Sequence, residues 1–267
     1  MQSFKEFERD AWEKKASRYE DTWGIVSTQS IPTILNKAKI TKGTRLLDCG
    51  CGLGHLCFQA SNLGAQAIGC DYSHEMLRLA SETYPTLAFE HQDAEHLSFS
   101  DESFDVVTLN FVLLHVSNQE RTLLEAKRVL KIGGSLIFSM WLPPEESDGL
   151  CLMFSAVKAH ADMSVIPPAQ DIFLFANLER ASEFLLQHGF GEIQAERVEN
   201  FWNVSDGDAF FSAVQAGTRI GGTIDLQTSE RKERIREEIL TGIEEFRDGT
   251  RYLIPTPSVV VAARRLE

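Results

Sequence analysis

The stretch Leu46-Leu47-Asp48-Cys49-Gly50-Cys51-Gly52-Leu53-Gly54 decides the fold of this chain. Its short apolar run predicts a buried strand, and a helix is expected to follow over residues 56–63. The glycines at alternate positions let the backbone take positive φ and approach a ligand closely. Ligands of open α/β sheets bind at the carboxyl ends of the strands. The stretch therefore predicts a strand, a ligand-binding loop and a helix in succession.

Apolar runs alternate with helical patterns through residues 41–141, on both sides of that stretch. Gly133-Gly134 are expected to end the last of the helices as a left-handed C-cap. The alternation is typical of βαβ units and predicts a parallel sheet. The expected strands are 45–48, 67–71, 86–90, 104–109 and 135–141, and the expected helices are 56–63, 73–83 and about 123–130.

Residues 145–254 form a second zone, which is mostly helical with irregular breaks. A helix is expected over 178–188, where Gly189 ends it, and a charged amphipathic helix over 230–246. Residues 191–199 have the pattern of a strand. Residues 258–263, rich in valine, are expected to return as a strand to the main sheet.

The charge balance argues against a nucleic-acid partner. The net charge is -13, whereas proteins that bind phosphate backbones need many Lys and Arg residues. A small-molecule substrate fits better. No run of about 18 apolar residues exists, which predicts no membrane span. The charged N-terminus does not resemble a secretory signal, so a cytoplasmic location is expected.

The five cysteines are expected to be free thiols, because an odd number in a chain expected to be intracellular does not suggest a disulfide framework. Cys49-x-Cys51 has no second Cys or His pair at the spacing of a zinc site. We therefore predict no metal site, and we interpret both cysteines as small residues at the junction of strand and loop.

A glycine-rich loop also fits a nicotinamide or flavin site, or a tight turn. Here the spacing is Gly-x-Gly-x-Gly with His55 next, so the dinucleotide pattern Gly-x-Gly-x-x-Gly is not met. The loop contains no Lys or Arg, unlike a phosphate-binding P-loop. An acid, Asp48, directly precedes it. Such a loop suits a ligand that carries an ammonium and a carboxylate rather than phosphates.

This loop resembles motif I of the class I methyltransferases that use S-adenosylmethionine (SAM), and further matches follow in order. The chain is similar to the small-molecule and quinone-biosynthesis group of that family. The matching stretches are Ile68-Gly69-Cys70-Asp71-Tyr72-Ser73-x-x-Met76-Leu77, Gln92-Asp93-Ala94-Glu95-x-Leu97-x-Phe99, Phe104-Asp105-Val106-Val107, Leu109 to His115, and Arg128-Val129-Leu130-Lys131-x-Gly133-Gly134.

The resemblance implies SAM as the cofactor and assigns it a set of binding residues. Asp71 would accept from the ribose hydroxyls, which a carboxylate can do. Asp93 would accept from the adenine amino group, and the Ala94 N–H would donate to the ring. Asp48 and Asp71 also fit helix caps. The expected cofactor-binding residues are Asp48, Gly50, Cys51, Gly52, Gly54, Asp71, Tyr72, Met76, Asp93, Ala94, Asn110 and Tyr19.

His115 is the candidate general base, since the ordinary pKa of histidine lies near neutrality; a structural role is the alternative. The implied reaction moves the sulfonium methyl to a nucleophilic atom of a small-molecule acceptor and releases S-adenosylhomocysteine. Alignment of the two reactants can supply most of the catalysis. The alternatives are a SAM-binding protein that does not methylate and a nicotinamide-dependent oxidoreductase.

The expected fold class is α/β: a doubly wound, mostly parallel, seven-stranded Rossmann-like sheet with a helical lid inserted after strand five. Residues 1–40 are expected to form helices that cover the cofactor site. Residues 41–142 and 178–267 would form the SAM-binding domain, and residues of about 143–177 and 203–250 the lid and substrate elements. The oligomeric state is left open.

Overall fold

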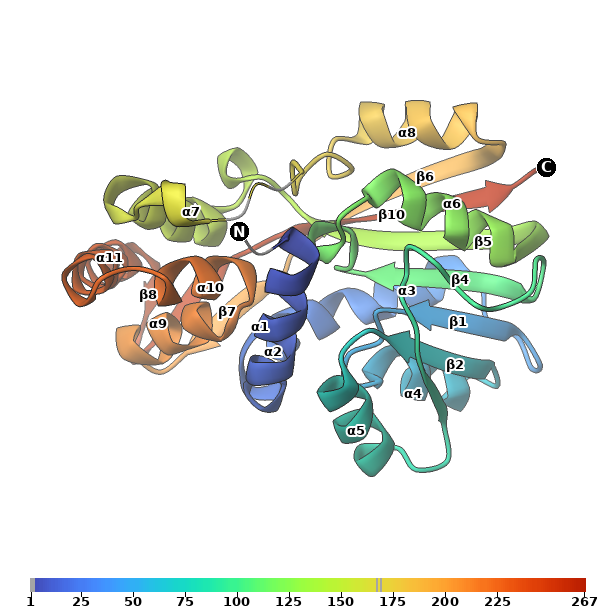
Figure 1. Cartoon of the computed structure of the whole chain (residues 1–267), viewed down its shortest axis with the longest axis horizontal. Helices are drawn as coiled ribbons and strands as arrows, with labels where there is room; N and C mark the ends of the chain where they lie inside the picture. The colour runs from blue at the N-terminus through green and yellow to red at the C-terminus, as the bar shows by residue number, and fades with distance from the viewer. Residues whose placement is uncertain (1–2, 167, 169) are drawn as a thin grey trace. The chain divides into compact units, whose positions relative to one another are not determined.

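The structure, a computed structural model, describes residues 3–166, 168 and 170–267 (Figure 1). The chain divides into two compact units. The sheet unit comprises residues 28–141, 170–198 and 258–267, and the second unit comprises residues 1–27, 142–169 and 199–257. Each unit is thus assembled from segments that are far apart in the sequence.

The sheet unit is built on a seven-stranded sheet, counted over the described residues, in the order β3-β2-β1-β4-β5-β10-β6. β1 to β5 run parallel, and β10 is antiparallel to both β5 and β6. This arrangement confirms the expected α/β fold. The strands are β1 (Arg45–Cys49), β2 (Gln66–Asp71), β3 (Ala88–His91), β4 (Phe104–Asn110), β5 (Leu130–Trp141), β6 (Phe190–Val198) and β10 (Ser258–Arg265).

Two helices of the sheet unit illustrate how a polar side chain caps a helix start. Ser73 accepts from the Met76 N–H and Asn118 accepts from the Arg121 N–H, which satisfies backbone donors left open at a helix start. The elements are η2 (Thr28–Ser30), α3 (Ile31–Ala38), α4 (His55–Asn62), α5 (His74–Thr83), η3 (Leu113–His115), α6 (Gln119–Val129) and α8 (Leu178–Gln187).

The prediction that Gly133-Gly134 end the helix before strand five is wrong. α6 ends at Val129, and Leu130 already has the extended backbone of β5, with φ -79° and ψ 135°. Leu130 is fully buried and pairs with Phe104 of β4, so its burial and strand pairing replace a glycine cap. Gly133 does take a positive φ of 78°, but within β5.

The core of the sheet unit includes α3. Ile31 and Ile34 of this helix pack in one cluster with Leu46 of β1 and Ile137 of β5. Their spacing of three residues puts both side chains on the same face of the helix. This packing supports β1, the strand that leads into the glycine loop.

The second unit contains a small antiparallel sheet in the order β7-β9-β8, which the sequence did not suggest. β8 has only two residues, too few for a periodic pattern. Its strands are β7 (Phe201–Val204), β8 (Arg247–Asp248) and β9 (Arg251–Pro255), and its helices are α1 (Phe4–Tyr19), η1 (Glu20–Gly24), α2 (Ile25–Ser27), η4 (Pro144–Glu146), α7 (Asp148–His160), η5 (Met163–Val165), α9 (Gly207–Ala216), α10 (Arg219–Asp225), α11 (Ser229–Gly242) and η6 (Ile243–Phe246).

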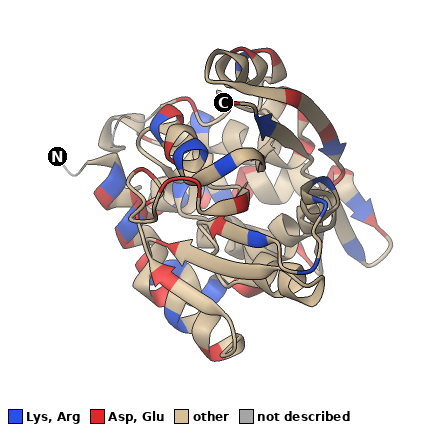
Figure 2. Ribbon diagram, turned by 90° about the vertical axis from the view of Figure 1, so that its right-hand side faces the viewer, with Lys and Arg blue, Asp and Glu red and all other residues tan. Residues whose placement is uncertain are grey.

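Acidic and basic residues are interspersed along the ribbon (Figure 2). Many of them pair within one helix, as Arg78 does with Glu75 and Glu82 in α5. None of the described helices combines the length and the apolar character needed to cross a bilayer.

Candidate functional site

The glycine loop joins the end of β1 to the start of α4, and its three glycines differ in what surrounds them. Gly50, Gly52 and Gly54 all take positive φ, at 68°, 51° and 80°. A Cβ on Gly50 would lie 2.5 Å from a methyl of Val112, and one on Gly54 would lie 2.6 Å from the ring of Phe89. A Cβ on Gly52 would meet no atom within 4 Å. The loop is therefore tightly packed at both ends and open at Gly52, where a ligand can approach.

Asp48 lies beneath this loop, with a carboxylate that is 2% exposed. Its Oδ1 accepts from Thr108 Oγ1 at 2.7 Å, and its Oδ2 faces Cys57 Sγ at 3.8 Å. Burial raises the pKa of Asp48 to about 7, against the opposing effect of the two hydrogen bonds. The carboxylate is thus directed at β4 and α4, and its contact with a ligand stays a prediction.

Cys51 is also buried, and its N–H donates to the Cys70 carbonyl at 2.9 Å. Burial raises the pKa of its thiol well above the ordinary value. Cys49, Cys57 and Cys70 are likewise free and buried. No group of three or more His, Cys, Asp or Glu side chains among residues 3–166, 168 and 170–267 is arranged to hold a metal ion.

Asp71, at the end of β2, connects the loops that follow three neighbouring strands. Its Oδ2 accepts from the Gly52 N–H and its Oδ1 from the Ser73 N–H, both at 2.9 Å. Its carbonyl accepts from the Gln92 N–H at 3.0 Å. Burial raises the pKa of Asp71, and its backbone hydrogen bonds oppose the rise. The structure therefore brings together the loops after β1, β2 and β3, as the motifs predict.

Tyr72 and Met76 continue from Asp71 into α5. Tyr72 is half-buried, whereas Met76 is 2% exposed and donates its N–H to Ser73 Oγ at 3.2 Å. Ser73, rather than Asp71, is the N-cap of the helix. This leaves the Asp71 side chain at the mouth of the glycine loop, while the burial of Met76 favours a packing role.

Asp93 and Ala94 form a turn after β3, and both are partly exposed. Asp93 Oδ1 accepts from the Glu95 N–H at 3.0 Å, and the Asp93 carbonyl accepts from the His96 N–H at 2.8 Å. The turn thus holds the Asp93 carboxylate close to its own backbone.

The end of β4 contains a strained turn that the motifs did not reveal. Asn110 Oδ1 accepts from Ser139 Oγ at 2.7 Å, and Ser139 Oγ accepts from the Phe111 N–H at 2.9 Å. Phe111 has φ 56°, a left-handed conformation that is rare outside glycine and recurs at functional sites. Its ring stacks on Trp141 with centroids 3.7 Å apart. The polar Ser139, within the apolar run from Leu136 to Trp141, was the signal in the sequence.

His115 and Tyr19 are the remaining candidates. His115 ends η3 and is half-buried. Burial raises the pKa of Asp71, and the charge of His115 is among the smaller effects that lower it, so the two groups interact. Tyr19 ends α1 in the second unit, where its hydroxyl lies 2.9 Å from Ser27 Oγ. The roles of both residues stay predictions.

Residues 47–138 match the family described as a methyltransferase domain. This stretch is similar to a methyltransferase domain. The matched stretch begins in β1 and ends in β5, so it includes the glycine loop, Asp71, the Asp93 turn and the strained turn at Phe111.

Two relatives illustrate the extent of the similarity. The uncharacterized methyltransferase YcgJ of Bacillus subtilis is 29% identical over 138 residues, which cover 50% of this chain and 54% of that protein. The demethylmenaquinone methyltransferase of Beutenbergia cavernae is 35% identical over 134 residues, which cover 48% of this chain and 56% of that protein. The chain spans about half the length of the relatives it matches.

Solved structures share the fold over more of the chain. The crystal structure of YcgJ has a TM-score of 0.61 at 20% identity and covers 89% of this chain and 98% of that one. Phosphoethanolamine N-methyltransferase 2 of Haemonchus contortus, solved with phosphomonomethylethanolamine and S-adenosylhomocysteine, has a TM-score of 0.60 at 20% identity. That match covers 100% of this chain and 61% of the other.

Proposed function

We propose that this protein is a SAM-dependent methyltransferase, which moves the sulfonium methyl to a nucleophilic atom of a small-molecule acceptor and releases S-adenosylhomocysteine. The observation that carries the proposal is the convergence of three loops on Asp71, beside a glycine whose surroundings are open. The match of residues 47–138 to a methyltransferase domain supports it.

The residues of this edge fit the chemical groups of SAM. The open backbone at Gly52 leaves room for the amino-acid part of the ligand. Each oxygen of Asp71 accepts one backbone N–H and retains a second lone pair for a ribose hydroxyl. Asp93 and Ala94 would face the adenine, and Tyr72, Met76, Asn110 and Tyr19 complete the proposed contacts. Asp48 and Cys51 would support the loop from below.

Bound SAM supplies an electrophilic methyl, so the chain itself needs to align the acceptor and keep water out. Alignment of two reactants in one site can be worth roughly 7–11 kcal/mol of the barrier. We propose that the elements at 143–177 and 203–250 act as the lid that excludes water. His115 would take the proton of an acceptor that loses one.

The acceptor class follows from charge and from the relatives. The net charge of -13 disfavours a polyanionic nucleic acid. One relative is named for a quinone substrate and one solved neighbour for an alkylamine phosphate, which supports a small-molecule acceptor. Fold alone does not select the acceptor atom.

The test is ligand binding followed by turnover. S-adenosylhomocysteine should raise the melting temperature, and nicotinamide dinucleotides should not. Asp71→Asn should abolish most of that shift. Asp105→Asn is the matched control, since Asp105 contacts Lys131 and the Arg45 N–H at the start of β4, the end remote from the loop.

Turnover is measured as release of S-adenosylhomocysteine from SAM across a panel of phenolic, amine and activated-carbon acceptors. A shift with NAD and none with S-adenosylhomocysteine would identify an oxidoreductase. Tight binding without turnover on any acceptor would favour a SAM-binding protein that does not methylate.

A further inference from the structure

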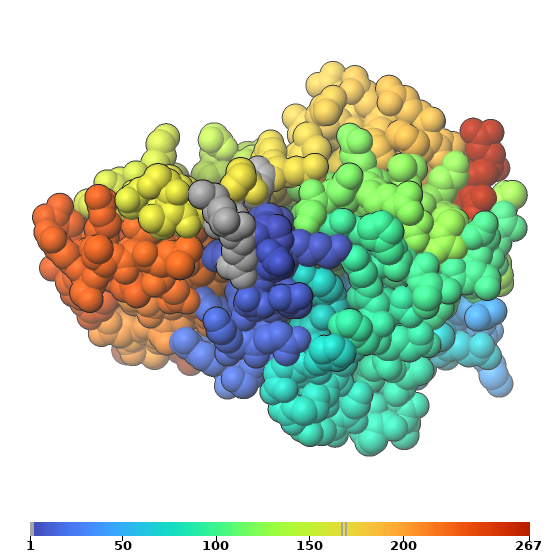
Figure 3. Space-filling model, viewed as in Figure 1, coloured from blue at the N-terminus to red at the C-terminus, as the bar shows by residue number. Residues whose placement is uncertain are grey.

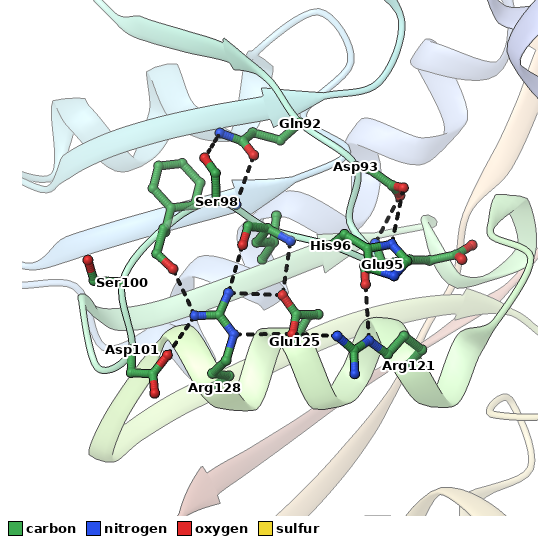
Figure 4. A network of polar contacts seen from close by, with 12 residues as sticks. Gln92, Asp93, Glu95, His96, Ser98, Ser100, Asp101, Arg121, Glu125 and Arg128 are labelled. Carbon is green, nitrogen blue, oxygen red and sulfur yellow. Dashed lines mark hydrogen bonds and ion pairs between the residues drawn. The ribbon is translucent and has the colours of Figure 1, made fainter.

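Glu95 lies in the turn that carries Asp93 and Ala94, and it is hydrogen-bonded through both its backbone and its side chain. Its N–H donates to Asp93 Oδ1 at 3.0 Å (Figure 4). Its Oε1 accepts from the N–H groups of Ser117 at 2.6 Å and Asn118 at 3.2 Å. The residue is 7% exposed. One buried carboxylate therefore joins the turn after β3 to the start of α6.

A second set of contacts holds the residues that follow the turn. Glu125 of α6 accepts from the Leu97 N–H at 2.9 Å, and Arg128 donates to the carbonyls of Leu97 and Phe99, both at 2.8 Å (Figure 4). Burial raises the pKa of Glu125, but the Arg128 hydrogen bond and the Leu97 N–H outweigh it, and the net shift is downward. In the space-filling view, the segment that follows β3 lies next to α6 on the surface (Figure 3).

The two sets of contacts act on different parts of the segment and meet at Arg121, which donates to the Glu95 carbonyl and to Glu125 Oε1, both at 3.2 Å. Glu125 and Arg128 hold Leu97 and Phe99, whereas Glu95 holds the turn itself. Hydrogen bonds to a charged group are roughly twice as strong as neutral ones. A negative charge at a helix N-terminus is also favourable. Glu95 therefore fixes the position of Asp93 from α6, in addition to His96, whose Nδ1 lies 3.5 Å from Asp93 Oδ2.

We propose that Glu95 is a positioning residue for the adenine end of the cofactor. It anchors the turn to α6 and so holds the Asp93 carboxylate and the Ala94 N–H ready before the ligand binds, which lowers the ordering cost of binding. The inference rests on the proposed function. Ser117 and Asn118 follow His115 by two and three positions, so the same carboxylate also holds the end of the loop after β4.

The experiment measures the Kd of S-adenosylhomocysteine and of adenosine by calorimetry. Adenosine contains the adenine and the ribose but lacks the amino-acid part. Glu95→Ala should weaken both ligands by the same factor, on the order of tenfold, because two backbone donors lose a charged acceptor. Glu95→Gln retains an acceptor oxygen and should stay within about threefold of the wild type.

Glu125→Ala is the matched control, a buried carboxylate of the same network that bonds Leu97 instead of the turn. It should lower the denaturation midpoint and leave both Kd values within about twofold of the wild type. A double-mutant cycle separates positioning from general damage. In an Asp93→Ala background, Glu95→Ala should change the Kd by less than it does in the wild type, because only the Ala94 N–H is left for Glu95 to position.

An unchanged adenosine Kd in folded Glu95→Ala overturns the inference, as does an equal loss in Glu125→Ala. If Glu95→Ala does not fold, Glu95→Asp replaces it in the experiment. This variant keeps the charge but is one methylene shorter, and a wild-type Kd of Glu95→Asp for adenosine overturns the inference. A wild type that binds neither ligand refutes the proposed function and the inference together. A wild type that binds both, with Glu95 variants unaffected, refutes the inference alone.

Discussion

Asp48→Asn should stabilise the protein above pH 7 and have little effect near pH 4. The asparagine is close in shape to the aspartate and keeps an oxygen that can accept from Thr108 Oγ1, so the main change is the removal of a buried titratable group. In the wild type, burial raises the pKa of Asp48 from 3.8 to about 7. The folded state therefore favours the protonated acid more strongly than the unfolded chain does.

The sign and size follow from that difference. Below pH 4 both states are protonated, and the contribution of Asp48 to stability is fully present. Between pH 4 and pH 7 the unfolded chain ionises first, and the free energy of unfolding falls by about 1.4 kcal/mol per pH unit. The loss levels off above pH 7 at an upper limit of about 4 kcal/mol, the shift from 3.8 to about 7 converted at 1.36 kcal/mol per unit.

The assay is urea denaturation of the wild type and Asp48→Asn at pH 4 to 8.5. The quantity of interest is the difference in unfolding free energy between the two proteins, because titrations common to both cancel. Asp105→Asn is the opposite control. Burial raises the pKa of Asp105, but the Lys131 contact and the Arg45 N–H outweigh burial, and the net shift is downward. Asp105→Asn should therefore be less stable than the wild type at neutral pH. A difference for Asp48→Asn that does not vary with pH would refute the reasoning.

Three further predictions test the packing around the site. Gly50→Ala should lower the melting temperature and weaken S-adenosylhomocysteine binding more than Gly52→Ala. The Cβ at position 50 would clash with Val112 at 2.5 Å, whereas at position 52 only the strained φ costs about 1 kcal/mol. Equal effects of the two variants in thermal shift and calorimetry would contradict this. Phe111→Gly should relieve about 1 kcal/mol of backbone strain but lose a buried ring stacked on Trp141. The free energy of unfolding in urea should fall by roughly 2–4 kcal/mol, and a rise would show that strain dominates. Ser139→Ala leaves the Phe111 N–H without its acceptor and should cost about 1–3 kcal/mol by the same measurement; no change would mean that the turn does not depend on this contact.

The elements of the sheet unit were predictable because their patterns are local. The apolar run before Asp48, the glycines after it and the Ser73 cap each act within a few residues of chain, and the structure forms the strand, the loop and the helix where they are expected. The helix end at Gly133 was wrong, since pairing of Leu130 with a distant strand decided it. The sheet of β7, β8 and β9 was missed because β8 has only two residues and because β7 pairs with a strand far along the chain, Phe201 with Pro255, which no local pattern encodes.

The glycine loop itself shows how the sequence and the tertiary structure divide the information. The sequence predicted that residues 46–54 form a glycine-rich ligand loop, because glycine spacing and the lack of basic residues are local properties, and the resemblance of the motifs that follow it implied SAM. Only the tertiary structure decided that Asp48 faces Thr108, sixty positions away, while Asp71 meets the Gly52 N–H. The reason is that the order and register of the strands determine which side chains meet, and no local pattern encodes that order.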